Sequence, residues 1–310
     1  MKLKKIFYPI LIHLLFSGNK AMSSLTVFAN FRIDSEERLI RMKDSFHSFY
    51  KADIDKWVIN IRGDFKKEAR QFLKDNLADR LVLFELESRW GWAHDSRKML
   101  KAIASDYVFF WIEDHICLPT TEYFNKVIRD MRQNHVEHLH YSFFKNGEIL
   151  KSFRSAGGHE TETIVWDVND LEKQKARESF ASPYYLISCC SITSRRLFSK
   201  LVTIRDPFIR KWSKHTPFNF EKPPQAINWL PLVDAFPNKE FFLPIDDEYV
   251  PQGSLISRGQ YPQRKSYDEM TSIRIQSENS GLGTVSSSEN CFKKFVAKVI
   301  KKIRWIENQL

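Results

Sequence analysis

Three adjacent side chains near the middle of the chain could hold a divalent cation. Glu113, Asp114 and His115, called here the 113–115 triplet, follow an apolar run at residues 107–112 that is typical of a buried strand. Carboxylate oxygens and imidazole nitrogens are common metal ligands, and an imidazole suits Mn²⁺ at least as well as Mg²⁺. The carboxyl ends of strands in open α/β sheets are where ligands bind. A strand that simply turns polar where it meets water is the alternative interpretation.

The spacing within the triplet separates two residues from the third. Side chains alternate along a strand, so Glu113 and His115 would share one side if the strand continued through them. Asp114 would then point away from that side. On this argument Glu113 and His115 are the candidate metal ligands. A turn that begins at Glu113 would remove the alternation and with it the argument.

Hydrophobic periodicity predicts the elements that position the triplet. Strand-like and helix-like patterns alternate at short intervals. Strands are expected at residues 25–31, 56–61, 81–86 and 107–112, and helices at residues 35–50, 65–77 and 96–104. Such alternation implies right-handed βαβ units. We therefore predict an α/β fold with a mostly parallel central sheet flanked by helices.

In this order the residues resemble the glycosyltransferase-A fold, and bacterial family-two-like glycosyltransferases in particular. The resemblance rests on the early strand, on Gly91 followed by Arg97 and Lys98 in a helix, and on a strand that ends in an acidic triplet. It covers roughly residues 25–260. The family pattern at the strand end is Asp-x-Asp, from which this triplet departs. It is similar to the Asp-x-His version of the polypeptide N-acetylgalactosaminyltransferases.

The resemblance implies transfer of a sugar from a nucleoside diphosphate, with Mn²⁺ or Mg²⁺ held by Glu113 and His115. A bound cation neutralises the charge that builds on the departing diphosphate without any proton transfer. The residues expected to contact the nucleotide sugar are Asn30, Arg32, Asp64, Arg97, Lys98, Asp114 and Arg258.

Trp166 and Asp167 are the residues expected to contact the acceptor. They lie in a stretch of mixed, loop-like composition, and the Trp166 ring could stack on the apolar face of a sugar. An ordinary core tryptophan is the alternative. Further on, a strand over residues 184–193 that runs into a helix at residues 194–198 is similar to a feature behind the active site of these enzymes.

Inverting members of the family place a carboxylate as general base beyond that helix. Glu221 occupies this interval and is the first candidate, although Lys222 stands where the family has the second acid of a Glu-Asp pair. Asp247 is the rival, because Asp246 and Asp247 follow another apolar run at residues 241–245. This second acidic group could instead supply a further metal ligand or form a solvated turn.

Composition divides the chain into four segments. They are a basic and apolar lead at residues 1–22, a catalytic domain at residues 23–270, a Ser-rich linker at residues 271–290 and a basic amphipathic helix at residues 291–310. The helix could dock on the catalytic domain, but its lysine-rich face favours an anionic membrane surface. We expect a cytoplasmic enzyme associated peripherally with the inner face of the cell membrane, within reach of a glycan or lipid-linked acceptor.

The lead segment and the cysteines bear on the compartment. The apolar stretch at residues 6–16 behind several lysines is typical of a secretory signal, yet Met22 stands three residues before the first expected strand and could be the true start. Export would separate the enzyme from cytosolic sugar nucleotides. Four cysteines show no paired spacing, and adjacent Cys189 and Cys190 look like buried thiols, which fits a reducing compartment.

Charge and missing motifs narrow the function. The net charge is +10, but it is concentrated in residues 1–22 and 289–310, so no distributed basic surface for nucleic acid is expected. The chain has no Gly-x-Gly-x-x-Gly, Walker loop or Gly-x-Ser-x-Gly. The expected function is a metal-dependent glycosyltransferase that acts with inversion in surface polysaccharide biosynthesis. The alternatives are a non-catalytic α/β scaffold that binds membrane or glycan, and a metal-dependent phosphohydrolase.

Overall fold

The computed structural model describes residues 25–88, 91–140, 146–180, 187–203, 229–246 and 253–263. Apart from the last two of these residues, all belong to one compact unit that ends at Tyr261. The predicted lead at residues 1–22, linker at residues 271–290 and amphipathic helix at residues 291–310 lie outside the described residues. Their roles therefore stay predictions.

The first half of the fold is the predicted alternation of strands and helices. Its elements are β1 (Leu25–Arg32), α2 (Glu36–Phe49), β2 (Lys56–Arg62), α3 (Lys66–Leu77), β3 (Leu81–Phe84), α4 (Trp92–Met99) and β4 (Tyr107–Phe110). Short 3₁₀ turns follow α3 at Ala78–Arg80 and α4 at Leu100–Ala102. The predicted order of elements is confirmed.

The helix expected at residues 96–104 is wrong in its bounds. α4 begins at Trp92, because the preceding Gly91 takes a φ of 85°, which glycine adopts without steric cost. The helix ends at Met99. Arg97 and Lys98 therefore lie in its last turn and not at its start.

The second half of the fold consists of shorter elements. They are β5 (His115–Cys117), α5 (Thr121–Gln133), β6 (His138–Leu139), α6 (Asn146–Ser155), β7 (His159–Glu160), β8 (Ile164–Asn169), α7 (Leu171–Phe180), β9 (Ser191–Ser194), α8 (Arg195–Thr203), β10 (Leu232–Pro237) and β11 (Phe242–Pro244). The strand expected over residues 184–193 is shorter than predicted, since β9 starts at Ser191. The helix expected after it is confirmed as α8.

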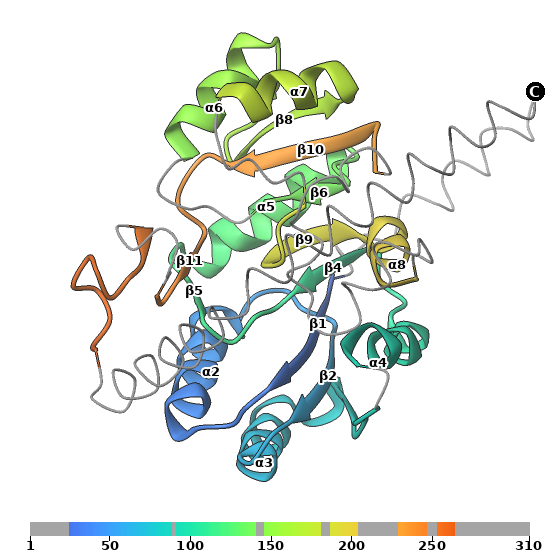
Figure 1. Cartoon of the computed structure of the whole chain (residues 1–310), viewed down its shortest axis with the longest axis vertical. Helices are drawn as coiled ribbons and strands as arrows, with labels where there is room; N and C mark the ends of the chain where they lie inside the picture. Colours follow the sequence, from blue (N-terminus) through green and yellow to red (C-terminus); the bar gives the residue numbers. More distant parts are fainter. Residues whose placement is uncertain are drawn as a thin grey trace, which may run out of the picture. The chain divides into compact units, whose positions relative to one another are not determined.

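Nine strands form one sheet in the order β3-β2-β1-β4-β9-β6-β10-β8-β7, while β5 and β11 form a separate two-stranded sheet (Figure 1). β1 is parallel to β2 and β4, and β6 is parallel to β10. β9 and β8 run against their neighbours. The predicted α/β class with a mostly parallel central sheet is confirmed. Because β2 and β4 flank β1, the strand order reverses direction between β1 and β4.

Helices cover both faces of the β1–β4 part of the sheet, which explains why its strands are apolar throughout. Phe109 meets Phe49 of α2 with ring centroids 5.1 Å apart, and the next residue, Phe110, meets Trp92 of α4 at 5.5 Å. Figure 1 shows α2 and α4 on opposite sides of β1 and β2. Strand alternation thus sends successive phenylalanines to opposite faces.

The helices of the described ranges are short. α2 has 14 residues and α5 has 13. No helix within these ranges combines the length and the apolar character needed to cross a membrane.

Gly63 closes the turn after β2, where no side chain fits. Its φ is +98°, and a Cβ added there would lie 2.4 Å from the Ile33 carbonyl oxygen. The Ile33 amide donates to the Arg62 carbonyl at 2.8 Å, and the Phe65 amide donates to the Ile33 carbonyl at 3.0 Å. The ends of β1 and β2 are therefore tied together around a position that requires glycine.

Gly63→Ala is expected to destabilise the protein through two effects. The positive φ costs about 1–2 kcal/mol, and the backbone clash adds about 1–3 kcal/mol. Gly157→Ala is the matched control, because Gly157 has a φ of +80° but a Cβ there would meet nothing within 4 Å. Urea unfolding should show a larger loss for Gly63→Ala than for Gly157→Ala. Equal losses would show that the Ile33 contact does not constrain the turn.

Candidate active site

The 113–115 triplet lies at the point where the strand order reverses. β4 is parallel to β1, and the Trp111 amide still donates to the Phe28 carbonyl at 2.9 Å just past the end of β4. A turn then begins at Glu113 and Asp114, and His115 is the first residue of β5. This turn cancels the alternation argument for Glu113 and His115. The carboxyl ends of strands at such a reversal are where open α/β sheets bind ligands.

β11 brings the second acidic group beside the triplet. Pro244 of β11 pairs with His115 of β5, and the Ile245 amide donates to the Asp114 carbonyl at 2.7 Å. Asp246 follows directly. Asp246 thus lies beside the triplet, where its carboxylate pairs with Arg41, and its role as a further metal ligand stays a prediction. Asp247, the rival candidate for the general base, lies outside the described residues.

Two serines of α2 hold β5 in place. The Ser45 hydroxyl donates to the His115 carbonyl and accepts from the Trp111 indole N–H at 2.8 Å. One helical turn later, the Ser48 hydroxyl accepts from the Cys117 amide at 2.9 Å. Hydrogen bonds to two positions of β5 fix the direction in which the chain leaves the triplet.

Two arginines of α2 face the carboxylates of the site. Arg38 donates to the Arg32 carbonyl at 2.9 Å and reaches Glu113 with its other terminal nitrogen at 3.5 Å. Arg41 pairs with Glu37 at 2.9 Å and with Asp246 at 2.5 Å. The Arg41 side chain is only 5% exposed, whereas that of Arg38 is 43% exposed. One arginine is therefore built into the site and the other lies at its solvent side.

The pKa values of the two adjacent carboxyl groups of the triplet are shifted in opposite directions. Burial, and then the negative charge of Asp114, raise the pKa of Glu113 to about 7, although Arg38 acts in the opposite direction. Burial alone would also raise the pKa of Asp114. The charge of His115 and its hydrogen bond to Asp114, 2.7 Å long, outweigh burial and lower that pKa. As the pH falls, Glu113 therefore takes up a proton before Asp114 does.

The side chains at this edge are of the types that a hard divalent cation accepts. Glu113, Asp114 and Asp246 carry carboxylate oxygens and His115 an imidazole nitrogen, but as the structure describes these residues they do not form a group of three ligand atoms within 4.8 Å of one another. The Glu113 side chain is 6% exposed and faces the more exposed Arg38 across 3.5 Å. A buried carboxyl group in such surroundings is stabilised by a cation. Glu113 and His115 remain the predicted ligands.

Three of the predicted nucleotide-sugar residues lie on the β1–β2 side of the site. Asn30 is buried, donates to the Trp92 carbonyl at 3.2 Å and accepts from Asn60 at 3.0 Å, so it joins β1 to α4 and β2. Arg32 ends β1 at the same edge as the triplet and pairs with Asp34 at 3.3 Å. Asp64 is exposed in the turn after β2.

The remaining predicted cations are engaged elsewhere in the fold. Arg97 donates to the Val202 carbonyl of α8 at 2.7 Å, and Lys98 is exposed in the last turn of α4. Arg258 pairs with Glu240 at 2.8 Å. Glu240 precedes β11, whereas Asp246 follows it, so the structure places the Arg258 ion pair at the other end of β11.

The predicted acceptor residues lie on β8, toward the far edge of the sheet. Trp166 stacks on His159 of β7 with ring centroids 4.4 Å apart, and Asp167 accepts from the Lys173 ammonium at 2.8 Å. Three strands separate β8 from β4, a distance of roughly 19 Å at the usual strand spacing. The structure does not bring these residues together with the triplet. Glu221, the first candidate for the base, lies outside the described residues.

Arg38 and Arg41 are the site residues that the sequence reasoning missed. They stand three apart in the helix correctly expected at residues 35–50, so they share one side of it. That spacing in the first helix after β1 was the available signal. It could not show that Arg41 is buried, because Asp246 comes from a distant part of the chain.

No protein-family model and no curated protein matches the chain. Among solved structures it is similar to S. aureus TarS 1–349 in complex with UDP, at a TM-score of 0.46 and 14% identity over 71% of this chain and 59% of that chain. It is also similar to the mannosyltransferase PcManGT from Pyrobaculum calidifontis in complex with GDP-Man and Mn²⁺. That match has a TM-score of 0.40 and 12% identity over 68% of this chain and 53% of that chain.

The chain thus spans little more than half the length of these two structures. UDP, GDP-Man and Mn²⁺ are ligands of those proteins. At such TM-scores and identities the likeness alone carries no activity over to this chain. Its own residues have to supply the argument.

Arg41→Ala is expected to destabilise the protein by about 3 kcal/mol or more, because it leaves the buried Glu37 carboxylate without its ion pair. Arg196→Ala is the matched control. Arg196 also pairs with a glutamate, Glu137, but its side chain is 79% exposed, so its loss should cost at most about 1 kcal/mol. Urea unfolding of both variants checks the difference. Similar small losses would show that Arg41 does not hold α2 to Asp246.

Proposed function

We propose that this chain is a metal-dependent glycosyltransferase that moves a sugar from a nucleoside-diphosphate sugar to a glycan or lipid-linked acceptor. The observation that carries the proposal is that the 113–115 triplet, Asp246 and two arginines lie along one edge of an α/β sheet, at the point where its strand order reverses. This is the position at which such folds bind nucleotides. The sequence resemblance to the glycosyltransferase-A fold supports the same activity.

In this proposal Glu113 and His115 hold Mn²⁺ or Mg²⁺. When bound, the cation supplies charge stabilisation to the departing diphosphate. Arg38 lies at the solvent side of Glu113 and is free to turn toward a phosphate group, because its side chain is 43% exposed. Arg41 has a different task, since its pairs with Glu37 and Asp246 keep the acidic residues in register. Asp114, with its lowered pKa, carries negative charge toward the cation or the ribose.

The donor and acceptor subsites follow from the sequence resemblance. Arg97 and Arg258, which the sequence predicted as donor contacts, are engaged with Val202 and Glu240. The donor contacts proposed are therefore Asn30, Arg32, Asp64, Lys98 and Asp114. Of these, Arg32 has the most favourable position, at the end of β1 beside Arg38. Trp166 and Asp167 are proposed as acceptor contacts only for an acceptor long enough to extend from the triplet to β8, since three strands lie between β4 and β8. Reaction with inversion would use Glu221, or in its place Asp247, as the base that accepts the proton of the acceptor hydroxyl.

The cellular setting is proposed from the sequence. The basic amphipathic helix at residues 291–310 would hold the enzyme peripherally on the inner face of the cell membrane. That location would bring the site to lipid-linked intermediates of surface polysaccharide biosynthesis. A cytoplasmic site would also give it access to sugar nucleotides.

Glu113→Ala and His115→Ala are each expected to lower transfer by roughly two to three orders of magnitude, as loss of a main charge-stabilising contact does. The measurement is release of nucleoside diphosphate from a panel of UDP- and GDP-sugars with Mn²⁺, together with the thermal shift that each donor produces. In the wild type, donor and Mn²⁺ should stabilise the protein together and not separately.

Glu162→Ala is the control for a general effect of removing a carboxylate, because Glu162 is 76% exposed and far along the chain from the triplet. It should turn over at the wild-type rate. Unchanged transfer in the Glu113 and His115 variants would reject their role as metal ligands. Absence of any donor-dependent shift across the whole panel would instead favour the non-catalytic scaffold.

The base is tested by exchanging each candidate for its amide. Glu221→Gln should lower turnover strongly while donor affinity stays nearly unchanged, because a base acts in the transition state and not in donor binding. Asp247→Asn should then have a small effect. The opposite pattern would move the base to Asp247, and a product with retained anomeric configuration would remove the need for either.

A further inference from the structure

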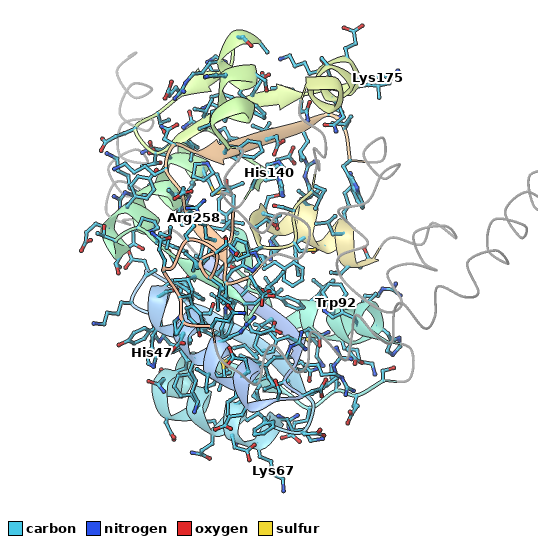
Figure 2. All side chains as sticks on the ribbon, turned by 60° about the vertical axis from the view of Figure 1, so that its left-hand side comes forward. His47, Lys67, Trp92, His140, Lys175 and Arg258 are labelled. Carbon is cyan, nitrogen blue, oxygen red and sulfur yellow. The ribbon has the colours of Figure 1, made fainter. Side chains whose placement is uncertain are left out.

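A second group of metal-competent side chains lies in the middle of the large sheet. His138 and His140 alternate along β6 and its continuation, so they share one face, and Asp234 of β10 pairs in register with His138. The His140 amide donates to the Ala235 carbonyl at 3.0 Å, which continues the ladder past the end of β6. We call these three residues the His-His-Asp cluster. Figure 2 shows His140 beside β10, well away from His47 and Trp92.

The donor atoms of the cluster converge on one point. His138 Nδ1 lies 2.9 Å from Asp234 Oδ1, and His140 Nε2 lies 2.8 Å from the same oxygen. All three donor atoms lie within 4.8 Å of one another. Ligands of a tetrahedral Zn²⁺ at the usual bond lengths are about 3.3 Å apart. A small outward movement of each side chain would therefore admit a cation between them.

The cluster is sealed from water. His138 and Asp234 are 0% exposed and His140 is 4% exposed. Asp167 of β8, which pairs in register with Asp234, already binds the Lys173 ammonium through both carboxylate oxygens at 2.8 Å. A carboxylate buried this deeply requires compensation of its charge, and the groups that converge on Asp234 are imidazole nitrogens, which bind either protons or metals.

The residues around His138 include polar groups that a bound cation would put to use. The Ser188 amide donates to His138 Nε2 at 3.4 Å, so without a metal the ring carries its proton on Nδ1 and gives it to Asp234. A cation at Nδ1 would move that proton to Nε2. The Ser188 amide would then have to give up its hydrogen bond to Nε2, and the Ser188 hydroxyl, which is buried and has no hydrogen-bond partner among the described residues, could take the place of the amide by accepting from Nε2. Metal-bound histidines usually donate their second N–H in this way.

The Thr193 hydroxyl is a second buried polar group close to His138. It pairs in register with His138 on the neighbouring strand β9, so both side chains lie on one face of the sheet. The Thr193 hydroxyl also lacks a hydrogen-bond partner within the described part of the chain. The Ser188 and Thr193 hydroxyls are two of ten buried side-chain polar atoms without a partner among the described residues, and each could donate to or accept from a group that enters the cluster.

We propose that His138, His140 and Asp234 form a second metal site, separate from the 113–115 triplet, that binds a zinc-type divalent transition metal. Two imidazoles and one carboxylate form a ligand set that Zn²⁺ favours, whereas Mg²⁺ prefers oxygen ligands alone. The triplet, with its excess of carboxylates, suits the harder cation. The two sites would therefore select different metals.

The position of the cluster indicates a structural task. β6 has two residues in register with β10, and only the Glu137 and His140 amides on either side extend this ladder, although both strands lie inside a nine-stranded sheet. A ladder this short contributes few hydrogen bonds. A cation shared by both strands would cross-link the part of the sheet that carries the triplet to the part that carries β10 and β8.

The test uses the full-length protein, stripped with a chelator, loaded with Co²⁺ and desalted. Co²⁺ reports tetrahedral nitrogen and oxygen ligands by its visible absorption, and elemental analysis gives the stoichiometry. We expect the wild type to retain about one equivalent with this absorption band, and His138→Ala and His140→Ala to lose both. Zn²⁺ should raise the melting temperature of the wild type and not of these variants.

Two further histidine variants serve as controls. His47→Ala removes an exposed histidine of α2 and should retain the metal. His115→Ala removes a ligand of the proposed catalytic site and should also retain Co²⁺, so failure of one site is distinguishable from failure of the other. Asp234→Asn keeps the side-chain shape and should still weaken Co²⁺ binding, which keeps the test valid if His138→Ala does not fold. A wild type that retains no Co²⁺, or a His138→Ala variant that retains it, would reduce the cluster to a hydrogen-bonded His–Asp–His group.

Discussion

The candidate active site depends on the ion pairs of one buried group, the Arg41 guanidinium. It lies between Glu37 of its own helix and Asp246 after β11, and it is 5% exposed. A charge so far from water is tolerated only when it is paired, so α2 and the segment after β11 must stay together. That segment also binds the triplet, through the hydrogen bond from the Ile245 amide to the Asp114 carbonyl. The arrangement of the carboxylates therefore follows from one ion pair.

The sheet supplies the frame in which this pairing has a chemical use. β1 and β4 are parallel neighbours at the point where the strand order reverses, and the chain after β4 turns sharply at Glu113 and Asp114. Ser45 and Ser48 of α2 then hold β5. α2, which packs on one face of the sheet, thus positions the triplet by its hydrogen bonds to β5. The same helix carries Arg38 and Arg41, which stand three residues apart and so share one side of it. Negative and positive groups meet at one edge, as binding of a diphosphate with a cation requires.

The triplet and the His-His-Asp cluster differ in their exposure to solvent and in the groups that surround them. The triplet has two carboxyl groups whose pKa values shift in opposite directions and a half-exposed arginine beside them, and perturbed pKa values of this kind are typical of functional sites. The His-His-Asp cluster is closed to solvent and joins two strands that share few backbone hydrogen bonds. A cation there would add stability to a short ladder.

The sequence by itself determined the α/β class and the order of the first elements, because apolar periodicity reflects which faces of each element are buried. It also located the triplet, since three polar residues at the end of an apolar run are a local signal. It misplaced α4, where the backbone of Gly91 decides the start. Only the tertiary structure decided which distant residues meet: Asp246 with Arg41, and Asp234 with His138. Those partners are joined by strand pairing and by burial of charge, which depend on the packed fold and leave no periodic trace along the chain.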